Sequence, residues 1–497
     1  MSVQHYQAKQ FKSQAREALA DQQLRDNFRG AMDYLQQKRK DAFNDPDELA
    51  QLRLHAENIR QRCLAKLPEL LEQLERHCEA NGIKVHWAED AAQAQQLIAG
   101  LIQQAGGQKV VKGKSMVTEE IALNQHLESL GIECVESDMG EYIVQLAEET
   151  PSHIIMPAIH KNKQQVADIF QQHIKDFNYT LSVDKLIQTG REVLRSKFQQ
   201  ADVGISGVNF AVAETGTLCL VENEGNGRMT TTVPPLHIAV TGIEKVVEFL
   251  SDVPPLFSIL TRSATGQHIT TYFNMISGPR RAPERDGPQQ VHLVLLDNGR
   301  SQAYADEALR KTLQCIRCGA CMNHCPVYTR VGGHAYGTTY PGPIGKIISP
   351  HLQGLANTSD LVTASSLCGA CEEVCPVNIP IPSLLQRLRR DAKLPTEAGQ
   401  PSLKGQASAA SVVEHTAWRA WAWLSTHSAI YNVCTSLVLS LAKFIPIPMG
   451  AWTRCRGKPA LAEQSFHQAM KQRQQQANKQ PISQSADQSS ASNKGSN

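Results

Sequence analysis

The chain has 497 residues, of which 41% are hydrophobic and 20% are charged, and its formal net charge is +2. That length is enough for about two to four domains, and the composition is that of an ordinary globular protein. A charge so close to zero argues against a nucleic-acid partner, which would need a concentrated basic surface. The first 24 residues lack the apolar core of an export signal, so we expect the chain to lie in the reducing cytoplasm.

The N-terminal segment, residues 1–80, is predicted to be helical. Its apolar residues recur three and four positions apart, which is the spacing of one helix face. Asn44–Asp47 carries turn and cap signals, so a new helix is expected to start there. These segments have the pattern of packing helices, and we assign no chemistry to them.

Residues 81–300 are predicted to form an α/β domain. Strand and helix patterns alternate there, as in βαβ units around a mainly parallel sheet with helices on both faces. The expected strands are 83–87, 109–113, 132–135, 154–156, 217–222, 236–240 and 291–296. The expected helices are 91–105, 118–130 with Thr118 as its cap, 158–174 and 243–250. His237 lies between apolar neighbours of a strand, where a core histidine is favoured over a ligand.

Two loops of this domain have features of a ligand site. In the first, a strand runs into a helix at Lys114 and Ser115, where a lysine and free backbone amides could hold an anion. The second is a strand-turn-strand passage whose turn contains Glu214, Thr215 and Gly216. Neither loop has the glycine pattern of a nucleotide-binding motif. An ordinary capped helix and an ordinary hairpin are the alternatives.

The strongest signal is a pair of cysteine motifs. The first reads C-x2-C-x2-C-x3-C-P and the second C-x2-C-x3-C-P. In such motifs a tight loop wraps its first cysteines around one iron–sulfur cube, and the cysteine before proline ligates the other cluster. The sequence therefore predicts two clusters. Cluster one is assigned to Cys315, Cys318, Cys321 and Cys375, and cluster two to Cys325, Cys368 and Cys371.

Cluster two is one cysteine short, because Ser365 stands where a full second motif would begin. Three interpretations remain open: a three-iron cluster, a four-iron cluster completed by Ser365 or another oxygen or nitrogen ligand, and a cluster with one open iron. His334, in the Gly-rich and Tyr-rich loop 331–345, is a further candidate, although a surface-loop histidine is favoured. Zinc and disulfides fit this spacing poorly.

The C-terminal third contains three further predicted regions. Helical flanks around the motifs indicate an α-helical ferredoxin-type domain over residues 301–395. Residues 396–465 contain a linker at 401–411 and then a Trp-rich apolar helical stretch, which is too short and too interrupted to span a membrane. Its tryptophans could lie at a membrane interface, against a partner subunit or on the protein itself. The Gln- and Ser-rich residues 466–497 are predicted to be a disordered tail.

Several of these segments together resemble the lactate-utilisation protein B family over nearly the whole chain. They are Lys112–Ser115, Ala213–Thr217, the two cysteine motifs, Tyr340–Gly345 and the Trp-rich segment. The resemblance implies a first large domain with a fold shared by sugar-phosphate isomerases and CoA transferases. It also implies the seven cluster cysteines given above, and work with two partner subunits in oxidising L-lactate to pyruvate.

We therefore interpret the chain as the iron–sulfur electron-transfer subunit of a lactate-oxidising complex. Such a subunit would lie in the cytoplasm, either free or peripheral to the inner face of the cell membrane. No flavin or nicotinamide fingerprint is present, so this chain alone is not expected to accept a hydride. The alternatives are a hydro-lyase that uses an open iron of cluster two as Lewis acid, and a redox sensor or assembly protein that binds a metabolite.

Overall fold

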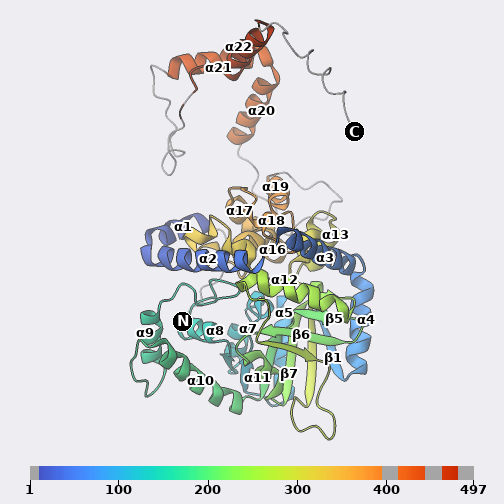
Figure 1. The fold of residues 1–497 in the computed structure, drawn as a ribbon. Helices are drawn as coiled ribbons and strands as arrows, with labels where there is room; N and C mark the ends of the chain where they lie inside the picture. The colour runs from blue at the N-terminus through green and yellow to red at the C-terminus, as the bar shows by residue number, and fades with distance from the viewer. Residues whose placement is uncertain (1–9, 394–411, 443–459, 461, 480–497) are drawn as a thin grey trace, which may run out of the picture. The chain divides into compact units, whose positions relative to one another are not determined.

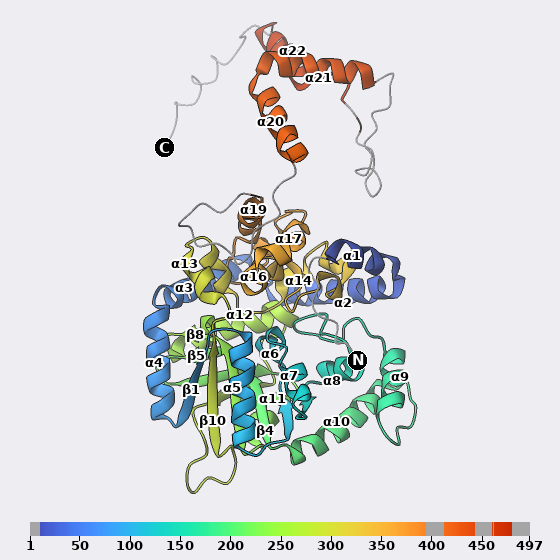
Figure 2. The same ribbon diagram turned by 180° about the vertical axis from the view of Figure 1, so that it is seen from behind.

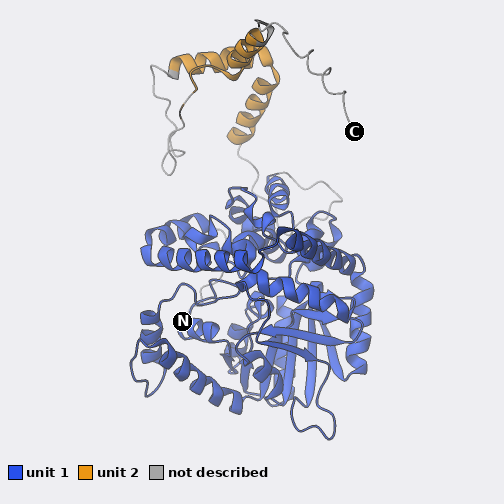
Figure 3. Ribbon diagram, viewed as in Figure 1, with its two compact units in different colours: residues 1–408 blue, residues 409–497 orange. Residues whose placement is uncertain are grey.

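The computed structural model describes residues 10–393, 412–442, 460 and 462–479. The chain divides into two compact units, residues 1–408 and 409–497 (Figure 3). The first unit contains the sheets and both cysteine motifs, and the described residues of the second form three helices. Each unit is described separately below.

The N-terminal segment is helical, as predicted. It forms α1 (Phe11–Ala20), α2 (Gln22–Ala42), α3 (Pro46–Ala65) and α4 (Leu67–Ala80). Helix α3 begins at the predicted turn, where the Asp45 carboxylate accepts the backbone N–H groups of Asp47 and Glu48 and Pro46 occupies the first helical position, a combination that favours a helix start. The buried Phe28 of α2 packs edge-to-face on Tyr328, with ring centroids 5.6 Å apart. The N-terminal helices are therefore tied to the region of the cysteine motifs.

A six-stranded sheet forms the centre of the α/β region. Its strands are β1 (Ile83–Ala88), β2 (Lys109–Lys112), β3 (Glu133–Glu136), β4 (Val203–Gly207), β7 (Leu236–Gly242) and β10 (Gln290–Leu296). They are ordered β1-β10-β7-β4-β2-β3, and every pair is parallel. Along β10, Val291 and Leu293 face one apolar core, whereas Val294 and Leu296 face another. The sheet is thus buried on both faces, as expected for parallel strands.

Helices cover this sheet on both sides (Figures 1 and 2). The helices of this region are α5 (Ala91–Gln104), α6 (Met116–Glu120), α7 (Leu123–Ser129), α8 (Met139–Leu146), α9 (Lys163–His173), α10 (Val183–Gln200), α11 (Asn226–Thr232) and α12 (Val253–Thr265). The prediction of a mainly parallel α/β domain is confirmed. The helix expected at 118–130 is instead broken at Ala122, whose φ of 48° interrupts it, and the cap of α6 is Ser115, not Thr118.

A second sheet was not predicted. It has the order β8-β5-β6-β9 and comprises β5 (Phe210–Val212), β6 (Thr217–Glu222), β8 (Val246–Val247) and β9 (Tyr272–Ile276). The helix expected at 243–250 is wrong, because this stretch forms a 3-10 turn at Ile243–Lys245 followed by β8. Arg60 explains the difference: its guanidinium donates to the carbonyl oxygens of Glu244 and Val246, which a helix would have used itself.

The strand expected at 154–156 is also wrong. The backbone N–H groups of Ile155 and Met156 both donate to Nδ1 of His153, at 3.0 and 3.2 Å. A histidine that accepts two successive amides curls the backbone into a turn, so the segment cannot join a sheet ladder. The three apolar residues had suggested a buried strand, and the histidine before them was the signal against it.

The region of the cysteine motifs is helical, as predicted. Its elements are α13 (Arg300–Ala305), η4 (Leu309–Gln314), α14 (Ala320–Asn323), α15 (Tyr328–Val331), η5 (His334–Tyr336), α16 (Gly342–Gln353), α17 (Leu355–Thr363), α18 (Ala370–Glu373) and α19 (Ile381–Asp391). The loop predicted over 331–345 is shorter than expected, because its last four residues form the first turn of α16.

The second unit contains α20 (Val412–Thr426), α21 (Ser428–Ala442) and α22 (Phe466–Lys479). The predicted helical stretch is therefore two helices that meet at His427, and the residues 466–479 expected to be disordered are helical. The linker at 401–411 lies outside the described residues. Trp418, Trp421 and Trp423 are each more than half exposed on α20. Across the described ranges, we find no helix whose length and apolarity would let it cross a bilayer.

A buried ion-pair network joins the α/β region to the first cysteine motif. Arg300 donates to both oxygens of Glu120, at 2.8 and 2.9 Å, and to Glu244 at 2.5 Å. Arg317 lies 3.2 Å from the other oxygen of Glu244. Although burial alone would raise it, Arg300 and Arg317 hold the pKa of Glu244 at about 2. Charges removed from water to this extent are stable only while every partner remains in place.

We expect Glu244→Gln to destabilise the first unit by about 3 kcal/mol, because breaking a buried pair leaves an arginine uncompensated. The measurement is the apparent Tm under anaerobic conditions at one fixed heating rate, since large proteins often unfold irreversibly. Glu133→Gln is the matched control, because it removes a carboxylate from a solvent-exposed pair with Lys197, for which the expected loss is less than about 1 kcal/mol. Equal Tm values for the two variants would contradict the structural role of the network.

Candidate functional site

The two cysteine motifs fold as copies of one turn. In the first, Arg317 and Gly319 have positive φ values of 62° and 76° and lead into the four-residue helix α14. In the second, Leu367 and Gly369 have φ values of 55° and 88° and lead into the four-residue helix α18. Positive φ is unusual for arginine and leucine, so its recurrence at equivalent positions shows that the backbone path is the same. That path brings successive cysteines of a loop to one side.

The equivalence extends to the residue at which each turn begins. The backbone N–H of Arg317 donates to Sγ of Cys315 at 3.3 Å. At the same place in the second motif, the backbone N–H of Leu367 donates to Oγ of Ser365 at 3.2 Å. Ser365 therefore occupies the position of the first cysteine in three dimensions as well as in the count of residues.

The seven cysteines of the motifs were predicted to form two groups. All seven are free thiols. Burial has the largest effect on the Cys321 thiol and raises its pKa. The charges of Cys318, Cys315 and Cys375 raise this pKa further. Burial and then Cys325, with a smaller effect of Cys368, raise the pKa of the Cys371 thiol to about 11. Such effects weaken with distance, so Cys315, Cys318 and Cys375 are electrostatic neighbours of Cys321, and Cys325 and Cys368 are electrostatic neighbours of Cys371. The crossed assignment of the seven cysteines to two clusters stays a prediction.

The two groups differ in their exposure to solvent. In the first, Cys318, Cys321 and Cys375 are buried and Cys315 is half-buried, whereas in the second Cys368 is exposed. Cys325 and Cys371 of the second set are buried, so the two sets differ mainly in the exposed Cys368. This difference fits two iron–sulfur clusters of unequal solvent access.

Buried cations near the cysteines were not found from the sequence. The Lys346 ammonium, on α16, lies 3.9 Å from Sγ of Cys325 and is almost completely buried. The pKa of Arg39, on α2, is lowered by burial, which is the larger effect. The charge of the nearby Cys318 acts in the opposite direction and raises it. Positive charge beside a thiolate-held cluster offsets the cluster's negative charge and tunes its potential. Lys346 directly follows the Gly- and Pro-rich stretch 331–345, which was the available signal.

A cavity of about 590 Å³ lies beside the first motif, where strand ends of the parallel sheet meet the cysteine region. Its wall includes Lys114 and Ser115, which the sequence singled out, together with Lys245, Arg317 and Tyr340. Ligands of open parallel sheets bind at the carboxyl ends of the strands, and Lys114 and Ser115 follow the end of β2. The cavity is therefore placed where such a fold accepts a ligand.

Glu214, Thr215 and Gly216 do not line this cavity, so the structure does not bring the turn of the second predicted loop to the first loop. The Glu214 carboxylate accepts the backbone N–H of Leu250, and the Thr215 carbonyl accepts the side-chain amide of Asn81. Gly216 has a positive φ of 63° and packs closely against the backbone of α4. These three residues lie in the hairpin between β5 and β6, and a ligand role for them stays a prediction.

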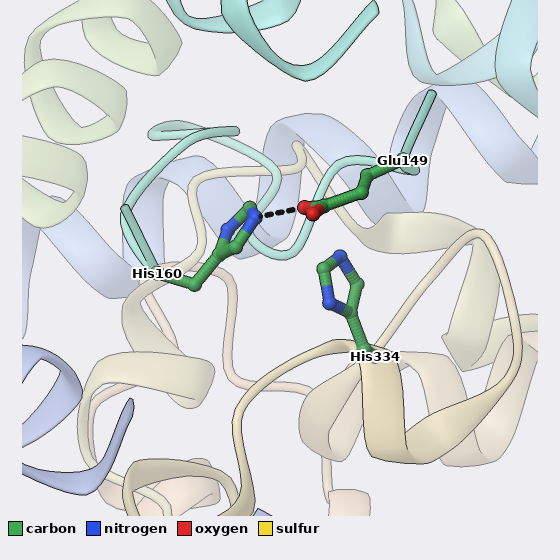
Figure 4. Close-up of side chains that lie close together, drawn as sticks. All are labelled: Glu149, His160 and His334. Carbon is green, nitrogen blue, oxygen red and sulfur yellow. Dashed lines mark hydrogen bonds and ion pairs between the residues drawn. The ribbon is translucent and has the colours of Figure 1, made fainter. Parts of the chain in front are cut away.

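A further group of potential metal ligands lies apart from the cysteines. Glu149, His160 and His334 face one another (Figure 4), with all three ligand atoms within 4.8 Å. The Glu149 carboxylate also forms an ion pair with Lys161, and Nε2 of His334 lies 2.6 Å from the carbonyl oxygen of Thr150. His334 is half-buried and bound in this group, so neither the surface-loop interpretation nor a role as missing cluster ligand fits it.

Comparison with known proteins agrees with this architecture. Three family models match in order: LUD domain over residues 71–296, 4Fe-4S dicluster domain over 311–379, and Lactate utilisation protein B, C-terminal, over 387–475. A relative from Bacillus velezensis named "Lactate utilization protein B" is 40% identical over 94% of this chain and 97% of its own. The chain belongs to the lactate utilization protein B family. A relative from Bacillus subtilis with the same name is 45% identical over 77% of this chain and 79% of its own.

Two other similar proteins carry different names. An Escherichia coli relative named "Uncharacterized electron transport protein YkgF" is 38% identical over 94% of this chain and 98% of its own. A crystal structure of a DUF162 family protein from Deinococcus radiodurans aligns over 46% of this chain and 98% of its own, with 13% identity and a TM-score of 0.27. A likeness that remote adds nothing to the argument about the site.

We expect Cys318→Ala to remove cluster one, because one of its four thiolates would be replaced by a methyl group. Anaerobic iron and sulfide analysis should show a loss of about four irons per chain. Cys219→Ala is the control, since Cys219 is a buried thiol of β6 whose pKa is raised by burial to about 12 and which lies in neither group. Unchanged iron content in Cys318→Ala would overturn the assignment of cluster one.

Proposed function

We propose that this iron–sulfur protein of lactate utilisation is the electron-transfer subunit of a complex that oxidises L-lactate to pyruvate. Its two clusters, held by the cysteines assigned above, would relay the electrons to a further carrier. The observation that carries the proposal is the pair of matched turns, which present four and three thiols at the spacing of a two-cluster relay. The names of the relatives supply the substrate.

The clusters would be adjacent along the chain. Cys321 belongs to cluster one and Cys325 to cluster two, and the short helix α14 contains the first and ends just before the second. In the same way, α18 contains Cys371, which is assigned to cluster two, and ends just before Cys375, which is assigned to cluster one. Each short segment thus serves both clusters, an arrangement that suits transfer of single electrons between them. Oxidation of lactate releases two electrons and two protons, so two one-electron clusters match the stoichiometry.

The complex would include two further subunits, one of which supplies the group that accepts the hydride or electron pair from lactate. We place the complex in the cytoplasm, with the exposed tryptophans of α20 as the surface for a partner or for peripheral contact with the membrane. A hydro-lyase remains the alternative that the test below would reveal.

We expect the anaerobically purified chain to be reduced by dithionite but not by L-lactate, because it has no two-electron cofactor. When it is purified together with its two partner subunits, L-lactate should reduce the clusters, and EPR should show the reduced-state signals. Lactate-independent loss of water from a hydroxy acid by the purified chain would instead favour the hydro-lyase. Clusters that no substrate reduces, in any assembly, would contradict the electron-transfer function.

Ser365 is proposed as the fourth ligand of a four-iron cluster two, because its Oγ occupies the place of Cys315 Sγ in the repeated turn. We expect Ser365→Ala to show an oxidised three-iron EPR signal and a loss of about one iron, whereas Ser365→Cys should keep about eight irons. The measurement is iron analysis with EPR on both variants beside the wild type. Identical spectra for wild type and Ser365→Ala would rule out ligation by this serine.

A further inference from the structure

The cavity beside the first cysteine motif contains two cations with unused hydrogen-bond donors. Lys245 lines the cavity and is only 7% exposed. Within the part of the chain that the structure describes, no group accepts a hydrogen bond from its ammonium. Nη2 of Arg317 donates to the Glu244 carboxylate, whereas Nη1 of Arg317 is buried and has no partner among the described residues. Buried charged groups normally have their donors satisfied.

The other lysine of the wall serves as a comparison. The Lys114 ammonium lies 3.1 Å from Asp138 Oδ2 and donates to the carbonyl oxygen of Ile155 at 3.0 Å. Lys114 is therefore satisfied by the protein, so the anion site that the sequence suggested at this residue is already occupied by a carboxylate of the chain. The donors of the cavity that lack a partner among the described residues belong instead to Arg317 and to Lys245, whose pKa burial lowers to about 7.

These two cations lie next to cluster one. Arg317 stands between Cys315 and Cys318 in the sequence, and the charge of Cys315 acts on Lys245 as well as on Arg317. The ring of Tyr340, 4.7 Å from the Arg317 guanidinium, and the ion pair with Glu244 hold that arginine in place. One free guanidinium N–H group and one ammonium group match two oxygens of a single anion.

The size of the cavity indicates more than an inorganic ion. About 590 Å³ is within the range of sites for organic ligands. The remaining wall combines apolar and neutral polar side chains, for example Met116 and Asn209, with three carboxylates. These carboxylates already have partners in the chain: Asp138 binds Lys114, Glu222 accepts the backbone N–H groups of Gly227 and Arg228, and Glu224 accepts that of Met139. Such a surface suits the uncharged body of an organic molecule whose charged group is held elsewhere.

We propose that this cavity binds an organic anion whose carboxylate or phosphate group is held by Lys245 and Arg317 beside cluster one. The inference rests on the proposed function and deepens it, because it places a ligand next to the cluster that is deeper in the protein. Sequence reasoning missed both residues: Lys245 lies in a stretch predicted to be helical, and Arg317 was hidden inside the cysteine motif.

The test uses the full chain with its clusters, purified anaerobically, and Lys245→Met. The carboxylate arm titrates pyruvate and 2-oxoglutarate, and the phosphate arm titrates inorganic phosphate and flavin mononucleotide, by calorimetry. One arm should show saturable binding that is weakened about tenfold or more in Lys245→Met, as expected for the loss of a charged hydrogen bond. Lys245→Arg, which keeps the charge, should bind within a few-fold of the wild type.

A second readout locates the ligand. Binding should shift the reduced-state EPR signal that Cys318→Ala removes, and leave the signal of cluster two unchanged. Lys40→Met, which removes an exposed lysine of α2, is the control and should bind like the wild type. No saturable binding in either arm, or equal binding by Lys245→Met, would overturn the inference.

The outcome is separable from that of the proposed function. Iron content and dithionite-reduced spectra are recorded first for every variant. A wild type with both clusters and no ligand binding would refute only the anion site. A wild type without two clusters would refute the proposed function itself.

Discussion

The structure depends on a small set of carboxylates and guanidinium groups buried where the α/β region meets the first cysteine motif. Glu244 is 1% exposed and lies between Arg300 and Arg317. Arg300 also forms an ion pair with Glu120. In a region of low dielectric such charges are costly to desolvate, so the network is stable in one arrangement only. Because Arg317 lies inside the motif, the network fixes the position of the first cysteine motif relative to the sheet and to the cavity.

The N-terminal helices also help to hold the first cysteine motif against the α/β region, although their sequence suggested packing alone. Arg60 of α3 is fully buried and donates to the carbonyl oxygens of Leu313 and Gln314, just before Cys315, and to those of Glu244 and Val246. One side chain therefore satisfies the end of η4 and the start of β8 together. The amphipathic pattern of α3 does not mark this arginine, since a buried arginine looks like any other polar residue in a sequence.

Prediction succeeded where the information is local and failed where it is not. The spacing of cysteines and glycines specifies the turn around a cluster, and alternation of strands and helices specifies the parallel sheet. The segments 154–156 and 243–250 depend on single contacts, from His153 and from Arg60, that have no periodic signature. The cavity is assembled from Lys114, Lys245 and Arg317, which are far apart in sequence and meet only in the folded chain.

The difference in burial between the two cysteine groups gives the proposed relay a direction. Cluster one would lie beside the cavity with Lys245 and Arg317, whereas cluster two would lie under the exposed Cys368. Electrons that enter from a ligand or partner at the deeper end would reach cluster two next, through the segments that both clusters share. The serine that replaces the eighth cysteine would then belong to the cluster nearer the solvent. A polar oxygen ligand loses less hydration there than it would in the apolar surroundings of cluster one, so its desolvation costs less free energy.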